Sequence, residues 1–103
     1  MPVSVALYAE FTVKNGSEDR VAELMAELTA RVRGESGNVV FDPHTRRENP
    51  NAYFVYEIYR DEEAFQAHIA AEHNKIFNAE LGGLTEEGGS QLSWLTPVVA
   101  TES

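Results

Sequence analysis

Apolar and polar residues alternate along the first segment of the chain, from Val3 to Val13, and this period of two predicts a β-strand. A second alternating segment, residues 53–60, has large side chains on both faces, which is typical of a sheet covered on both sides. One face consists of Tyr53, Val55, Glu57 and Tyr59, and the other of Phe54, Tyr56, Ile58 and Arg60.

Two regions have the spacing of apolar residues that is typical of α-helices. The first follows the turn sequence Lys14-Asn15-Gly16, begins after a candidate N-cap at Ser17 and can end at Gly34. The second begins after a candidate N-cap at Asp61. Phe65 and Ile69 are expected to form its buried stripe, and Ile76, Phe77 and Leu81 follow in a further helical piece.

Two more strands are predicted, at residues 38–48 and 91–99, and a turn at residues 49–51 would make the second and third strands a hairpin. Pro43 indicates an edge strand or a bulge, because proline has no backbone N–H to donate. The order β-α-β-β-α-β predicts an α+β, ferredoxin-like fold with a four-stranded antiparallel sheet. We expect one domain, residues 1–103.

The helices of such a fold cover one face of the sheet, so the other face needs a different cover. Here that face would carry Tyr8, Phe54, Tyr56 and Ile58, which is too apolar to leave in water. A second copy packed sheet to sheet is the simplest cover, so we expect a homodimer through this face.

The composition limits which classes of partner and which cellular location are expected. The net charge is −9, from 8 Lys and Arg against 17 Asp and Glu, and a domain without a basic stripe is not expected to bind nucleic acid. No stretch is apolar and long enough to span a bilayer, so no membrane partner is expected. No basic segment followed by an apolar one is visible, so no signal peptide is expected. The absence of cysteine excludes thiol chemistry and fits a cytoplasmic location.

Glu57 is the sharpest candidate for chemistry, because a carboxylate between two tyrosines on a covered strand is costly to bury without a partner. It could act as a base with a raised pKa or orient a substrate hydroxyl. It could equally be paired with an arginine or a backbone amide for structural reasons alone. Tyr53 and Tyr59 on the same face are candidates to stack on an aromatic ligand, or core aromatics.

His68 and His73 are candidate bases on the second helix. They are separated by roughly 140° around a continuous helix, so their spacing argues against a two-histidine zinc site, and no metal is expected. By the same reasoning His73 would lie nearer the centre of the buried stripe than His68. Each, like His44 on the second strand, could also be purely structural. Phe77 and Trp94 are candidates for a pocket wall or the core, and Asn78 could hold a ligand carbonyl or be a solvated helical residue.

With these residues in view, the chain resembles the antibiotic biosynthesis monooxygenase family of dimeric α+β-barrel proteins. The resemblance covers nearly the whole chain, from VALYAEFTVKNG at residues 5–16 to YFVYEIYRDEEAFQAHIAAEH at residues 53–73. The family's third strand typically reads "YE.W" before an acidic helix start, and its next helix reads "AH…..H". Here these become Tyr56-Glu57-Ile58-Tyr59 with Asp61, and Ala67-His68 with His73.

The resemblance implies a dimer of ferredoxin-like subunits with a pocket between each sheet and its helices. Better-known members oxidise phenolic or quinol-type polyketides with O₂ and no metal or flavin, so no cofactor is expected. The members that degrade haem use an asparagine, a tryptophan and a histidine where this chain has Ala9, Tyr59 and Asn78, so haem degradation is not expected.

Three functional hypotheses follow. The first is a cofactor-independent monooxygenase for a small phenol, quinol or polyketide, with His73 or His68 as base, Glu57 orienting it or the substrate, and Tyr53 and Tyr59 lining the pocket. The second is a non-enzymatic binding or structural dimer. The third is an isomerase of a small phosphorylated signalling sugar, which needs a cationic cradle that this acidic chain scarcely offers.

Overall fold

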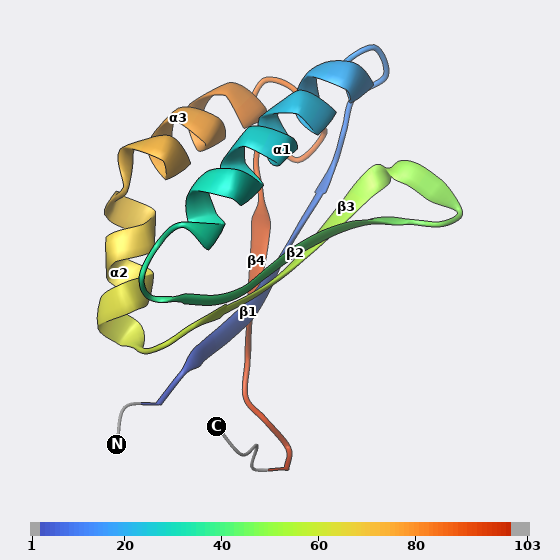
Figure 1. Ribbon diagram of the computed structural model, residues 1–103. Helices are drawn as coiled ribbons and strands as arrows, with labels where there is room; N and C mark the ends of the chain where they lie inside the picture. The colour runs from blue at the N-terminus through green and yellow to red at the C-terminus, as the bar shows by residue number, and fades with distance from the viewer. Residues whose placement is uncertain (1–2, 100–103) are drawn as a thin grey trace.

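One antiparallel sheet carries all three helices on a single face (Figure 1). The computed structural model describes residues 3–99. The elements are β1 (Val5–Thr12), α1 (Glu18–Arg33), β2 (Asn38–Arg46), β3 (Asn49–Tyr59), α2 (Glu62–Ala70), α3 (Glu72–Leu81) and β4 (Gln91–Leu95). The strand order is β2-β3-β1-β4, which confirms the ferredoxin-like prediction, with the second helical region divided into α2 and α3.

The register of the two central strands decides which side chains face the helices. Leu7 of β1 lies opposite Glu57 of β3, and Val5 lies opposite Tyr59. Directly paired residues point to the same face of a sheet, so Glu57 shares its face with the apolar side of β1. The alternation in both segments is therefore confirmed, and Glu57 and Tyr59 point toward the helices.

The helix starts follow local chemistry. The Asp61 carboxylate caps α2, accepting a hydrogen bond of 2.8 Å from the backbone N–H of Ala64. Ser17 precedes α1 as predicted but makes no side-chain capping bond. Instead, the Glu18 carboxylate accepts from the backbone N–H of Gly16 at 2.9 Å.

Strand ends differ from the predicted ones. Asn49 begins β3, so the turn lies at residues 47–48 rather than 49–51. The reason is that the carbonyl of Asn51 accepts a hydrogen bond of 2.8 Å from Val13, which keeps this segment in the sheet. β4 ends at Leu95, short of residue 99, while Pro43 lies on the edge strand β2 as expected.

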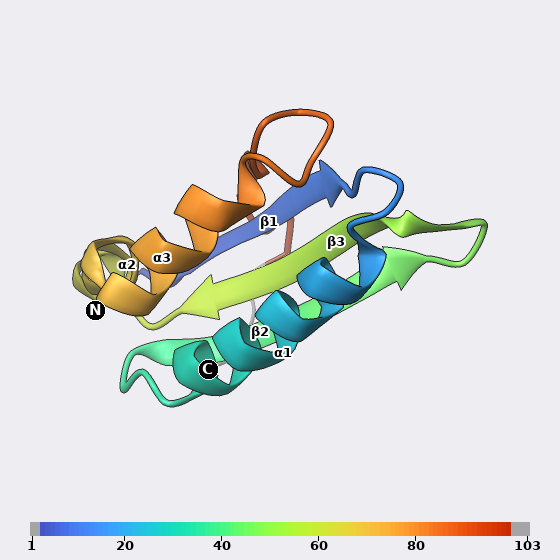
Figure 2. The same ribbon diagram turned by 90° about the horizontal axis from the view of Figure 1, so that it is seen from above.

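The core lies between the sheet and the helices, where α1 and α3 run side by side (Figure 2). Its larger part joins the apolar faces of these two helices to β1 and β3. A smaller cluster joins Ala64 and Phe65 of α2 to Leu7 and Tyr59 of the sheet. Within residues 3–99, no helix combines the length and apolar character needed to span a membrane.

The opposite face of the sheet carries the expected apolar side chains beside an ion pair of Arg46 and Glu10 at 3.2 Å. Tyr8 stacks on Phe54 with ring centroids 4.7 Å apart, and Tyr56 and Ile58 are likewise only partly buried. The homodimer through this face remains a prediction, as does the extent of the domain.

Candidate active site

A cavity of about 410 Å³ lies between the sheet and the helices. Its walls are mainly apolar and come from the four strands and three helices of the described chain. The polar side chains on its walls are Glu57, His68, Asn74, Asn78 and Ser90. The cavity is therefore an apolar space with a few convergent polar groups, which is the usual form of a small-molecule site.

Glu57 is the buried carboxylate of this cavity, with only 6% of its surface exposed. The hydroxyl of Tyr59, two residues along the same strand face, donates a hydrogen bond of 2.7 Å to Glu57 Oε1. Burial raises the pKa of Glu57 to about 7, the hydrogen bond from Tyr59 opposes the shift, and the charge of Glu35 adds to it. Burial, followed by the adjacent Glu57 charge, raises the pKa of Tyr59, so its hydroxyl stays protonated.

His68 faces Glu57 from α2. Its Nε2 lies 3.9 Å from Glu57 Oε1, and its ring packs on Tyr59 with centroids 4.7 Å apart. His68 is 5% exposed, whereas Ile69, which was expected in the buried stripe, is 40% exposed. That expectation is wrong because α2 turns its Phe65 and His68 side inward, three residues apart on one helix face.

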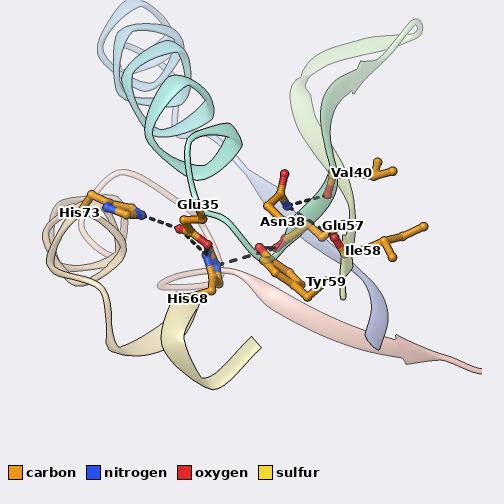
Figure 3. A network of polar contacts seen from close by, with 8 residues as sticks. All are labelled: Glu35, Asn38, Val40, Glu57, Ile58, Tyr59, His68 and His73. Carbon is orange, nitrogen blue, oxygen red and sulfur yellow. Dashed lines mark hydrogen bonds and ion pairs between the residues drawn. The ribbon is translucent and has the colours of Figure 1, made fainter. Parts of the chain in front are cut away.

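Glu35 joins the two histidines, and sequence reasoning missed it. His68 Nδ1 lies 3.0 Å from Glu35 Oε2, and His73 Nε2 lies 2.6 Å from the same oxygen. Figure 3 shows the two imidazoles pointing at this carboxylate from two different helices, with Glu57 and Tyr59 on the far side of His68. The result is a continuous row of polar groups from β3 to α3.

A helix break brings the two histidines together. Ala71, between α2 and α3, has φ −65° and ψ 139°, an extended conformation that ends one helix and starts the next. The spacing argument against a two-histidine site assumed one continuous helix, and this assumption is wrong. Among residues 3–99, one group of three potential metal ligands converges, namely Glu35, His68 and His73, with donor atoms within 4.8 Å of one another.

The loop that carries Glu35 is held against α2 by Gly37. A Cβ built on Gly37 would lie 2.3 Å from the Cβ of Ala64, so only glycine permits this approach. The carbonyl of Gly37 also accepts a hydrogen bond of 2.8 Å from the backbone N–H of Arg60. The one sequence signal for Glu35 was therefore its position between Gly34 and Gly37, which places it in a tight connection.

Two of the five predicted substrate-binding residues line the cavity and three do not. Phe77 and Asn78 line the cavity. Tyr53, Tyr59 and Trp94 are absent from its lining. Tyr53 stacks on Phe11 at 4.9 Å, and Trp94 is 60% exposed on the edge strand β4.

His73 lies outside the cavity as well and borders a separate hollow between α1 and α3. His44, on β2, is exposed. No observation tests the roles assigned to any of these residues, which stay predictions.

Comparison with known proteins identifies one matching protein family. The profile of the family described as "Antibiotic biosynthesis monooxygenase" matches residues 4–80. No curated protein matches the sequence. This family match supports a monooxygenase-like function in general.

Solved structures share the fold at low sequence identity. Rv0793 from Mycobacterium tuberculosis has 20% identity and a TM-score of 0.88, over 97% of this chain and 100% of that one. PA3566 from Pseudomonas aeruginosa has 23% identity and a TM-score of 0.86, over 96% and 98%. A structure described as an antibiotic biosynthesis monooxygenase has 20% identity and a TM-score of 0.86, over 92% and 99%. The profile spans most of the sequence and the fold agrees, so the chain belongs to the antibiotic biosynthesis monooxygenase family.

Proposed function

We propose that the protein is a monooxygenase that oxidises a small phenol, quinol or polyketide-type ring with O₂ in this cavity, without a redox cofactor. The observation that carries the proposal is the pair of Glu57 and His68, two proton-accepting groups 3.9 Å apart on a mainly apolar wall. Family membership supports the same class of reaction.

The cavity suits a flat aromatic ring. Its volume of about 410 Å³ falls in the range of small-molecule sites, and Phe11, Phe65 and Phe77 offer ring faces and edges for stacking. Asn78 on α3 could hold a carbonyl or hydroxyl of the substrate. Apolar walls also keep water from the electron-rich anion that the reaction requires.

His68 is the base in this proposal, and Glu35 is its positioning residue. With Nδ1–H donated to Glu35, the lone pair of Nε2 faces Glu57 and the cavity. A phenol is a weaker acid than an imidazolium by about 3 to 4 pKa units, so proton transfer in water costs about 5 kcal/mol. The carboxylates of Glu35 and Glu57 flank the imidazolium that forms and offset part of that cost.

The reaction balances without an external reductant. For a hydroquinone, deprotonation to the quinolate is followed by electron transfer to O₂ and formation of a carbon–oxygen bond. One oxygen atom stays on the ring as a hydroxyl and the other leaves as water, giving a hydroxyquinone. The quinol itself supplies the four electrons that reduce O₂.

A non-enzymatic binding or structural role is the second candidate. Within residues 3–99, no buried side-chain nitrogen or oxygen lacks a hydrogen-bond partner, so no buried polar group requires a ligand. The isomerase hypothesis lacks support, because no lysine or arginine of the described chain lines the cavity and a phosphate would find no cation there.

Oxygen uptake by purified, chelator-treated protein with a panel of hydroquinones tests the proposal. We expect uptake by the natural protein and a loss of about 10²- to 10⁴-fold in His68→Asn, the range for removing a general base. His44→Asn, an exposed histidine on β2, is the control and should retain activity. Uptake no faster than buffer for every quinol, with no ligand-dependent thermal shift, would favour the non-enzymatic role.

A further inference from the structure

We propose that Glu35, His68 and His73 form a binding site for one divalent transition-metal ion such as Zn²⁺, placed beside the cavity rather than in it. Two imidazoles and one carboxylate are a set of protein ligands that zinc and related ions use. Each residue offers a donor atom, and the three donors lie within 4.8 Å of one another.

The present spacing is close to what a metal ion requires. Bonds of about 2.1 Å in a tetrahedral site place neighbouring donors about 3.4 Å apart. Here Glu35 Oε2 lies 3.0 Å from His68 Nδ1 and 2.6 Å from His73 Nε2. In the proposed site these two separations would widen by less than about 1 Å as metal bonds replace the hydrogen bonds.

The surroundings of His68 also fit a metal ligand. A coordinating histidine usually turns its second ring nitrogen toward a carboxylate or carbonyl, which fixes the ring. The Nε2 of His68 faces Glu57 at 3.9 Å, and Glu57 is itself held by the Tyr59 hydroxyl at 2.7 Å. The side chain of His68 is 6% exposed, and those of Glu35 and His73 are 16% and 24% exposed, so an ion would be shielded yet reachable.

The charge balance favours a cation. Glu35 is the only charged group in direct contact with both histidines among residues 3–99, and it neutralises part of the ion's charge. Arg60 shares a surface hollow with Glu35, but its guanidinium pairs with Asp61 at 3.3 Å. The chain as a whole carries a net charge of −9.

The site would control the base of the proposed function, and this consequence alone rests on that proposal. An ion on Nδ1 leaves the proton of a neutral imidazole on Nε2, so His68 could no longer accept a proton from a phenol. Metal binding and base catalysis at His68 would exclude one another.

Calorimetric titration of the chelator-treated full chain with ZnCl₂, without substrate, tests the site. We expect one ion per chain, no comparable binding of Mg²⁺, and visible d–d bands when CoCl₂ is used. His73→Ala should weaken Zn²⁺ binding at least about 10-fold, the scale seen when even an outer partner of a metal site is lost. Glu35→Gln should weaken it similarly, while His44→Ala should not.

Several outcomes would overturn the site. These are no binding at one ion per chain, equal affinity in His73→Ala and the natural protein, or an equal loss in His44→Ala. Circular dichroism of the metal-free variants checks their fold, and Glu35→Gln decides the question if His73→Ala does not fold. The measurement involves no turnover, so its result is independent of whether the protein oxidises quinols.

Discussion

Gly37 and Ala64 pack so closely that a methyl group on Gly37 would lie 2.3 Å from the Cβ of Ala64. This approach fixes the loop after α1 against the start of α2 and so places Glu35 between the two histidines. We expect Gly37→Ala to destabilise the protein by about 1 to 3 kcal/mol, the usual cost of overpacking.

Chemical denaturation measures this effect, with Gly34→Ala as the matched control. A Cβ at Gly34 would lie 3.4 Å from the nearest atom, the carbonyl oxygen of Arg31, and its backbone is already in the right-handed helical region. Its denaturation midpoint should therefore change little. Equal midpoints for the two variants would contradict the close packing of Gly37 on Ala64.

Glu57 should make the metal-free protein less stable as pH rises. Its pKa is 4.5 when unperturbed and about 7 in the folded protein, so between these values the folded state binds more protons than the unfolded state. Stability therefore falls with rising pH across this window, by up to about 3 kcal/mol from this group. Denaturation at a series of pH values should show a flatter profile for Glu57→Gln. An unchanged profile in that variant, or the same flattening in the exposed-turn control Glu48→Gln, would disprove the assignment.

The Tyr59 hydroxyl stabilises the ionised form of Glu57, because it donates to the carboxylate. Tyr59→Phe keeps the ring and removes this donor, so the pKa of Glu57 should rise above its value in the natural protein. Carbon-13 NMR of the glutamate carboxyl groups follows this change directly. Tyr53→Phe, whose ring stacks on Phe11, is the control and should leave the Glu57 titration in place.

The apolar outer face of the sheet should form a homodimer interface. We expect Tyr56→Lys to shift the protein toward monomer in size-exclusion chromatography with light scattering, because an added charge in a sheet-to-sheet contact is costly to bury. Ala22→Lys, exposed on α1, adds the same charge elsewhere and should remain dimeric. A natural protein that is monomeric at micromolar concentration would contradict the interface.

The strands were predictable from the sequence because alternating apolar and polar residues indicate both a strand and the face that each side chain occupies. Alternation alone placed Glu57 and Tyr59 beneath the helices, as the register of β1 and β3 confirms. The family was also recognisable, because its third-strand and helix patterns are local in sequence.

The polar row was not predictable, because it depends on two non-local features. One is the break at Ala71, which no proline or glycine announces. The other is the loop contact at Gly37, which brings Glu35 to His68 across 33 positions of sequence. Trp94 was predicted from its residue type to line the pocket or the core, but it lies exposed on the edge strand β4.

Ala71 alone connects α2 to α3, so the placement of α3 depends on the length of this connector more than on which side chain it carries. One residue added or removed there would change where α3 begins relative to α2. His73 would then be displaced from Glu35, and Phe77 from the core. Sequence change at this point should be tolerated far better as substitution than as insertion or deletion.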